Sequence, residues 1–164
     1  MRQPGIPLIL FLSLLLSACG FQPRGQVPQL QNLPQPVYIS GVQAYSPLHR
    51  ELSSQLRQAG VALAGDGKSA ASLLRIHDRS SRRRVFSVDS NNRAVEFELE
   101  ESLRFSLRHA AQGELIEDQT VRVLRILYRP GSEVLARERE ETQLREDMRR
   151  ELVGRIIRRL QAQG

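Results

Sequence analysis

The sequence contains one cysteine, one lysine and no apolar run long enough to cross a membrane. Because Cys19 is the only cysteine, the chain cannot form an intramolecular disulfide. The histidines lie on different expected elements without paired spacing, so with a single cysteine they form no metal-ligand set; they are His49, His77 and His109. Residues 65–68 lack the spacing of a phosphate loop, and no nucleophile motif occurs. The sequence therefore predicts no metal, no cofactor and no enzyme.

The first eighteen residues have the layout of a secretory signal peptide. Arg2 precedes an apolar run over residues 6–16, and the small residues Ser17 and Ala18 follow it. A membrane span needs about 20 apolar residues, and this run is shorter. We therefore expect residues 1–18 to be removed.

The segment from Leu16 to Cys19 reads Leu-Ser-Ala-Cys and resembles the bacterial lipobox. In that motif the cysteine receives S-diacylglycerol and then an N-palmitoyl group, and several acyl chains hold a protein durably on a membrane. The alternative is an ordinary secretory signal followed by a chance cysteine. Gly20 stands where lipoproteins retained at the inner membrane carry aspartate, so we expect Cys19 to anchor the protein to the periplasmic side of the outer membrane.

The charge of the chain is strongly positive and is carried almost entirely by arginine. The net charge is +6, and Lys68 is the only lysine. Export removes the chain from nucleic acid and presents it with another polyanion, the phosphorylated lipopolysaccharide. A guanidinium grips phosphate with two parallel hydrogen bonds, which an ammonium cannot do. A genome bias toward arginine explains the composition equally well.

The mature chain is divided into a tether and one domain. Residues 19–36 are rich in proline, glutamine and glycine and lack periodicity, which is typical of a tether. The following residues, 37–164, have the length of a single domain with one core. A strand is expected at residues 37–39, and a helix follows it, capped by Ser46 and ending near Gly60.

Three strands and a long helix are expected in the remainder. The second strand begins at Ser72 and extends through a basic stretch to Val88, and a turn at residues 89–92 follows. The third strand alternates, and its apolar residues Val95, Phe97, Leu99, Leu103, Phe105 and Leu107 share one parity. The fourth runs over residues 120–128, with a bulge before Ile126.

The final helix is expected over residues 133–162. One stripe is apolar, and the other face carries Arg145, Arg149, Arg150, Arg155, Arg158 and Arg159. This basic face either docks on a membrane surface or is simply solvated. The element order is β-α-β-β-β-α, so we predict an α+β sandwich in which two helices cover one face of a four-stranded, mostly antiparallel mixed sheet.

Four features of the chain occur together: the segment Cys19-Gly20-Phe21-Gln22-Pro23-Arg24-Gly25, the order of the elements, the basic hairpin, and a last helix opening with Leu135-Ala136-Arg137. In this combination the chain resembles the LptE (RlpB) family of lipopolysaccharide-assembly lipoproteins. The resemblance implies an outer-membrane lipoprotein that plugs the LptD β-barrel, helps it fold and contacts lipopolysaccharide on its way to the outer leaflet. A generic periplasm-facing envelope lipoprotein, which binds another protein or the cell wall, is the alternative function.

Arginines on both sides of the expected hairpin are the candidate phosphate site. They are Arg79, Arg82, Arg83, Arg84 and Arg93. Guanidinium groups held close together repel one another, and an anion relieves that repulsion. The arginines could bind lipopolysaccharide or an acidic wall of the barrel. The third alternative is that they are only solvated and bind no anion. The family resemblance adds Arg137, near the start of the last helix, as a further candidate; pairing with Glu133 or Glu141 is the other possibility for this residue.

Overall fold

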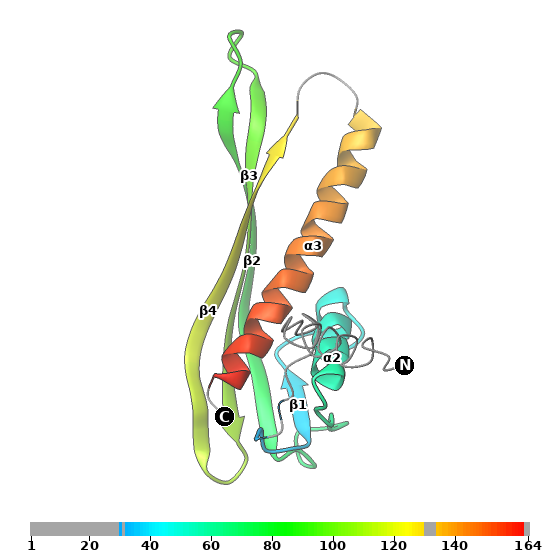
Figure 1. Ribbon diagram of the computed structural model, residues 1–164, viewed down its shortest axis with the longest axis vertical. Helices are drawn as coiled ribbons and strands as arrows, with labels where there is room; N and C mark the ends of the chain where they lie inside the picture. The colour runs from blue at the N-terminus through cyan, green and yellow to red at the C-terminus, as the bar shows by residue number, and fades with distance from the viewer. Residues whose placement is uncertain (1–29, 31, 130–133, 163–164) are drawn as a thin grey trace, which may run out of the picture.

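The computed structural model describes residues 30, 32–129 and 134–162, without the side chains of 134–137. The elements occur in the predicted order: β1 (Val37–Ser40), α2 (Pro47–Gln58), β2 (Ser72–Val88), β3 (Ala94–His109), β4 (Gly113–Tyr128) and α3 (Val134–Gln161). Figure 1 shows that β2, β3 and β4 form one long twisted ribbon, with α3 running beside it. Neither α2 nor α3 is long and apolar enough to span a membrane.

The strands form one mixed sheet in the order β1-β2-β3-β4. The short β1 pairs with β2 in parallel, through a register that sets Val37 opposite Ser72. Both other pairings are antiparallel. Among the described residues, nothing pairs with β2 on the β1 side beyond Arg75, so the described sheet is three-stranded toward the hairpin.

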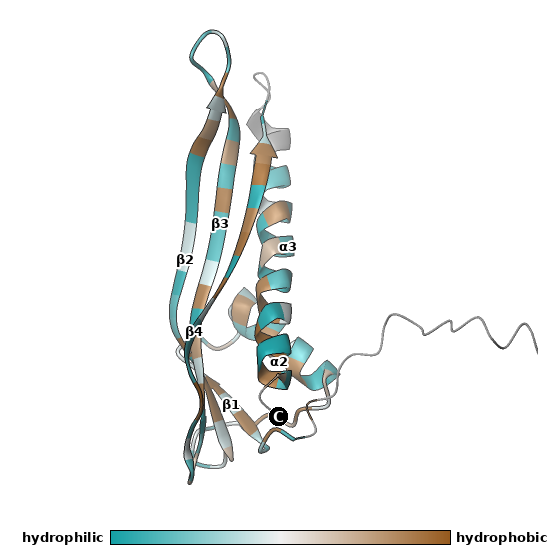
Figure 2. Cartoon of the chain, turned by 60° about the vertical axis from the view of Figure 1, so that its left-hand side comes forward, coloured by the Kyte–Doolittle hydropathy of each residue, from teal (hydrophilic) through white to brown (hydrophobic). Residues whose placement is uncertain are grey.

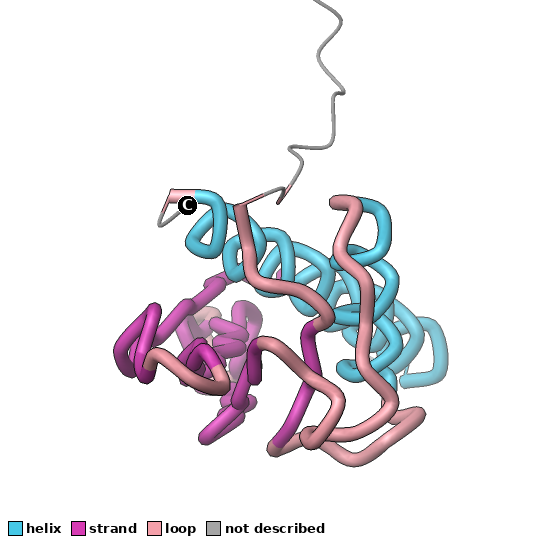
Figure 3. The backbone as a smooth tube through the Cα atoms, turned by 90° about the horizontal axis from the view of Figure 1, so that it is seen from below, coloured by secondary structure: helices cyan, strands magenta, loops and turns pink. Residues whose placement is uncertain are grey.

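Both helices lie on the same side of the sheet, as Figure 3 shows. Their buried leucine, isoleucine and methionine side chains meet the apolar side chains of β2, β3 and β4 in a single core. Met148, Ile156 and Phe105 are completely buried. The α+β sandwich predicted from the sequence is therefore confirmed.

The start and end of α2 follow the signals in the sequence. The Ser46 side chain accepts the backbone N–H of His49 at 3.2 Å, which satisfies one of the free donors of the first turn. Pro47 occupies the first helical position, where its missing N–H costs nothing. Gly60 follows the helix with φ +81°, a conformation that suits glycine.

The fourth strand differs from its prediction in length and in regularity. It begins at Gly113, seven residues before the expected start. The expected bulge before Ile126 is wrong, because the register with β3 is continuous from Thr120 to Tyr128. The apolar side chains change parity there for another reason: Arg125 faces the helices and pairs with Glu151, while Leu124 and Ile126 face the open side.

The folded domain begins before the predicted boundary at Val37. Leu30 and Leu33 are both buried in the core, and the Leu30 N–H donates to the Ala59 carbonyl at 3.0 Å. Two leucines with pairwise spacing of three residues give too short a pattern to reveal this packing in a proline-rich segment. The expected tether covered residues 19–36. Its last part, which includes Leu30 and Leu33, therefore belongs to the domain.

An irregularity in β2 decides which of its arginines face the helices. The register with β3 shifts between Ile76 and Asp78, so that His77 has no direct partner. Before the shift Leu74 and Ile76 point into the core; after it Arg79 pairs with Leu103 and shares its face. One extra residue in a strand exchanges the two faces of everything that follows it.

Gly41 gives a test of how closely β1 and β2 approach each other. A Cβ atom at Gly41 would lie 1.9 Å from the carbonyl oxygen of Ile76, whereas one at Gly60 would meet nothing within 4 Å. Both glycines have positive φ. We expect Gly60→Ala to lower the free energy of unfolding by about 1–2 kcal/mol through backbone strain alone. Gly41→Ala should cost at least about 2 kcal/mol more.

Urea unfolding followed by circular dichroism measures both glycine variants. Gly60→Ala is the matched control, since it carries the same backbone penalty without the steric overlap. Equal losses in the two variants would contradict the close approach of Gly41 to β2.

Candidate functional site

The candidate arginines of the hairpin do not form one cluster, because the sheet divides them between its two faces. Arg79 and Arg83 pair in register with Leu103 and Leu99, whose side chains are buried on the helix side. Arg82 and Arg84 therefore face the open side, and Arg93 follows the turn at the tip of the hairpin. The structure thus separates residues that the sequence grouped together.

On the helix side, the arginines are neutralised by acids of the same chain. Arg83 lies 3.1 Å from Glu141 of α3, and Arg79 lies 3.7 Å from Glu101 of β3. The Arg83 guanidinium also stacks over the ring of Phe97, 4.5 Å from its centre. Arg83 therefore joins β2 to α3, whereas Arg79 joins β2 to β3.

Arg145 lies at the centre of this ion-pair network. It donates to Glu101 at 2.8 Å, to Ser81 at 2.8 Å and to Glu141 at 2.9 and 3.0 Å. Glu101 is only 2% exposed, and Arg129 brings a further cation within 2.6 Å of Glu141. Acids and arginines of opposite charge therefore alternate through a half-buried layer.

The sequence contains a sign of this network that its interpretation missed. Glu101 has the same parity in β3 as Leu99 and Leu103, so it is the one charged residue within an otherwise apolar face. A buried carboxylate needs a cation with good geometry, and Arg145 of the last helix provides it. Arg145 was expected on a solvated or membrane-docking face. That expectation is wrong, because its side chain is only 22% exposed and pairs with Glu101 and Glu141.

On the open face, acids of β3 lie between the arginines of β2 and the far edge of the sheet. Arg84 pairs with Glu98 at 2.7 Å. Arg82 is exposed and has no ion pair with any residue in the described part of the chain. A shallow cavity of about 330 Å³ lies here, lined by Arg82, Arg83, Arg84, Glu98 and Glu100.

Two other candidates have only partial structural descriptions. Arg93, at the hairpin tip, pairs with Asp89 at 2.9 Å and is largely exposed. Arg137 lies in the first turns of α3, but its side chain is outside the described part of the structure. Cys19 lies outside the described residues altogether.

Exposed apolar side chains gather near the hairpin end of the sheet; those of β4 lie on the open face, whereas Val85 of β2 is in register with Phe97 and lies on the helix side. Those on β4 are Leu124, Ile126 and Tyr128, and those near the end of β2 are Val85, Phe86 and Val88. Figure 2 shows the hydrophobic colour near the ends of β2 and β4, close to the hairpin. Soluble monomers seldom gather so many large apolar groups around one end of a sheet, so this pattern indicates a contact surface.

A serine, a histidine and an aspartate meet on the open face without forming a catalytic triad. The Nε2 atom of His77 lies 2.8 Å from the Ser106 hydroxyl and 2.8 Å from the Asp118 carboxylate. A triad requires the acid on the other ring nitrogen, so that Nε2 is free to take the serine proton. Asp118 also pairs with Arg104 at 2.8 Å. Within the described ranges, no three potential ligands gather around a metal position.

Comparison with known proteins gives the family directly. The family model described as "LptE: Lipopolysaccharide-assembly" matches residues 34–160. The chain belongs to the LptE family. Curated relatives named "LPS-assembly lipoprotein LptE" include one from Photorhabdus laumondii, 30% identical over 98% of this chain and 87% of its own, and one from Yersinia pestis, 32% identical over 98% and 77%. LptE proteins are assembly lipoproteins, so the prediction that this chain is not an enzyme is confirmed.

Solved structures of similar chains have the same fold. Rare lipoprotein B from Shewanella oneidensis superposes with a TM-score of 0.67 at 21% identity, over 77% of this chain and 93% of its own. Lipoprotein B from Nitrosomonas europaea gives a TM-score of 0.65 at 30% identity, over 85% and 88%. The predicted family and the predicted fold are therefore both confirmed.

The ion-pair network makes stability depend on the charge of Glu141. Partial burial raises the pKa of this carboxyl, but the hydrogen bond and charge of Arg145, with the charges of Arg129 and Arg83, outweigh burial and hold it below the ordinary value of 4.5. A lowered folded-state pKa stabilises the protein above pH 4.5, and this contribution is lost as pH falls through the lowered value.

We expect Glu141→Gln to reduce the free energy of unfolding at pH 7 by about 1–3 kcal/mol, since it leaves three arginines without their shared acid. The difference from wild type should shrink at pH 3, because lowering the pH toward the depressed pKa of Glu141 removes the contribution of its charge. Urea unfolding at the two pH values measures it. Glu146→Gln, an exposed neighbour, should change stability by less than about 0.5 kcal/mol. A Glu141→Gln loss that does not change with pH would contradict the electrostatic origin.

Proposed function

We propose that this LptE-family protein is an outer-membrane lipoprotein that works with an LptD-like β-barrel to insert lipopolysaccharide into the outer leaflet. The observation that carries the proposal is the family match over residues 34–160, together with curated relatives named for lipopolysaccharide assembly. The protein takes part in lipopolysaccharide assembly as a binding and folding partner, and it makes or breaks no bond.

The proposed anchor is the lipid on Cys19. Residues 1–18 form the signal peptide, and Cys19 carries S-diacylglycerol and N-palmitoyl groups that hold the mature chain on the periplasmic side of the outer membrane. Gly20 supports this destination, because lipoproteins retained at the inner membrane carry aspartate at this position. The remainder of the expected tether then joins the lipid to the core at Leu30.

The proposed partner is the inner wall of the barrel, and the domain acts as its plug. The exposed apolar side chains at the hairpin end, Val85, Phe86 and Ile126 among them, supply a contact surface that a monomer would not keep. The exposed arginines and glutamates beside them suit the polar interior of a large barrel. A permanent complex of this kind buries well over about 2,000 Å².

The proposed lipopolysaccharide contact uses the open-face arginines. Arg79 and Arg83 lie on the helix side and pair there with Glu101 and Glu141. We therefore assign the phosphate-binding role of the original group to Arg82, which has no ion pair among the described residues, and to Arg84 and Arg93, whose side chains stay 73% and 74% exposed beside Glu98 and Asp89. Their side chains are exposed and reach solvent near the hairpin end of the sheet. Arg137 stays a candidate on the ground of family resemblance alone.

Cross-linking inside the cell tests the partnership. A photoreactive amino acid at Ile126, an exposed position of β4, should give one adduct whose mass equals the lipoprotein plus a large β-barrel. The full-length tagged chain, recovered from detergent-solubilised outer membranes, should also hold that barrel in a one-to-one amount, and its N-terminal peptide should carry the acyl groups on Cys19.

The same photoreactive residue at Gln58, exposed on α2, tests whether the adduct depends on the open face. Recovery without a barrel and without any adduct would contradict the plug function. It would favour the second candidate, a generic envelope lipoprotein with a different protein or the cell wall as partner.

A lipopolysaccharide titration tests the open-face arginines. Arg82→Gln with Arg84→Gln in one chain should weaken binding of fluorescent lipopolysaccharide to the full-length protein in detergent by roughly tenfold, the loss expected for two charge-assisted contacts in an exposed setting. Fluorescence anisotropy measures the affinity.

The matched control is Arg75→Gln with Arg108→Gln. These exposed arginines lie on the same sheet face, at the end away from the hairpin, and their removal lowers the net charge by the same amount. Equal weakening in both double variants would show that only total charge matters and would overturn the assignment of lipopolysaccharide to Arg82 and Arg84.

A further inference from the structure

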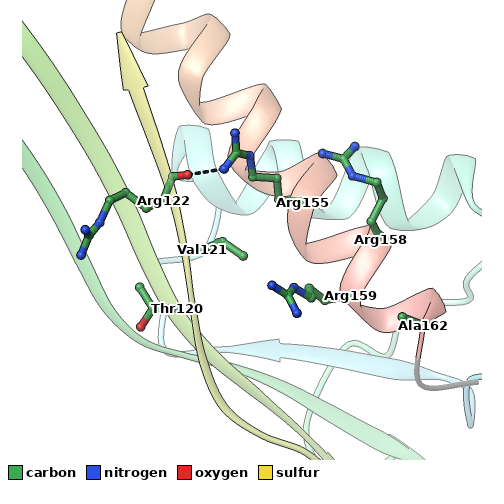
Figure 4. A pocket seen from close by; sticks show the side chains of 7 residues that line it. All are labelled: Thr120, Val121, Arg122, Arg155, Arg158, Arg159 and Ala162. Carbon is green, nitrogen blue, oxygen red and sulfur yellow. Dashed lines mark hydrogen bonds between the residues drawn. The ribbon is translucent and has the colours of Figure 1, made fainter.

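A second basic site lies at the opposite end of α3 from the hairpin. A groove of about 600 Å³ separates the last turns of α3 from β4, and its lining contains four arginines and no acid: Thr120, Val121, Arg122, Arg155, Arg158, Arg159 and Ala162 (Figure 4). The 28 residues of α3 span roughly 40 Å, so this groove is remote from the hairpin arginines.

The charge in the groove comes mainly from the last turns of α3. Figure 4 shows that Arg159 extends from the helix toward β4, whereas the Arg122 side chain points away from the helix. Arg122 has its own partner, Glu100 at 3.4 Å on the open face. Arg155 donates to the Arg122 carbonyl at 2.5 Å, which fixes the helix against the strand.

Acids of the chain compensate only part of this charge. Glu151 pairs with Arg155 at 2.7 Å, and it also serves Arg125. The Arg155 hydrogen bond, with the charges of Arg125 and Arg155, keeps the pKa of Glu151 below its ordinary value. Arg158 and Arg159 have no ion pair with any acid of the described ranges. Two exposed arginines that line this acid-free groove therefore have no acid partner among the described residues.

We propose that this groove, defined by Arg155, Arg158 and Arg159, binds the phosphate group of a membrane lipid. Guanidinium groups bind phosphate through charge-assisted hydrogen bonds, and an anion in a groove lined by several arginines lowers their mutual repulsion. The favourable position of cations at a helix C-terminus explains arginines in this turn. It does not explain why Arg159 extends into a groove rather than to solvent.

The position in the molecule favours a lipid as the source of the phosphate. Figures 1 and 2 place the first described residues and the C-terminal end of α3 at the same end of the molecule. Leu30 follows Cys19 by about eleven residues, which reach at most roughly 40 Å when fully extended. This step depends on the proposed anchor at Cys19, which would keep the groove near the headgroups. Val121 and Ala162 add apolar atoms to the groove.

Calorimetric titration of the full-length chain in a non-ionic detergent tests the groove with two probes. These are inorganic phosphate and dihexanoyl phosphatidylglycerol at concentrations where it is monomeric. We expect the lipid to bind and Arg158→Gln with Arg159→Gln to weaken it roughly tenfold. Arg158→Lys with Arg159→Lys keeps charge and helix, and it should show an intermediate loss because an ammonium cannot form the two-pronged contact.

The Arg75→Gln, Arg108→Gln chain is the control of equal charge and should bind the lipid as wild type does. Tighter binding of the lipid than of inorganic phosphate supports a headgroup site, and equal binding of both supports a phosphate site without lipid preference. Failure of both probes to bind wild type, or an equal loss in the control, overturns the proposal. Since neither probe is lipopolysaccharide and no barrel is present, these outcomes are independent of the proposed function.

Discussion

The packing of α3 against one face of the long sheet is the contact on which the rest of the structure depends. In its second half the helix contributes Met148, Leu152 and Ile156, all almost fully buried, to the same core as α2. In its first half the contact changes character, since Arg145 and Glu141 meet the polar side chains of β2 and β3. Apolar burial supplies the general attraction, and the ion pairs fix the register of the helix over the strands.

This division follows from the shape of the sheet. The strands of the hairpin extend far beyond β1 and α2, so one helix alone must cover the upper part of the sheet. A single helix buries a narrow stripe, and the side chains at its borders stay partly wet. Arginines such as Arg83 and Arg129 suit such a border, because their stems cover apolar surface while their charged ends reach Glu141. No helix of the described part of the chain covers the open face, which leaves that face available for a partner.

The sequence was sufficient to predict the elements and the fold class, because each signal for them is local. Ser46 and Pro47 start α2, and the alternation in β3 separates its two faces. The distribution of the arginines was beyond its reach, since it depends on the shift after Ile76, where His77 falls out of register. A one-residue irregularity leaves little trace in a polar stretch, yet it moves Arg79 and Arg83 to the helix side.

Burial distinguishes the arginines that stabilise the fold from the arginines that can bind a ligand. An arginine count gives one basic surface, but the structure gives acid partners to some arginines and leaves others, such as Arg82 and Arg159, without an ion pair among the described residues. Arg145 stays paired with Glu101, because the buried Glu101 carboxylate needs a cation beside it. Arg82 and Arg159 lie where water compensates them, so an anionic ligand displaces only solvent and no acid of the chain. An anion bound at Arg82 of β2 or at Arg159 of α3 would therefore leave the central ion pairs intact, so the sheet and the helix could each hold one of the two proposed contacts.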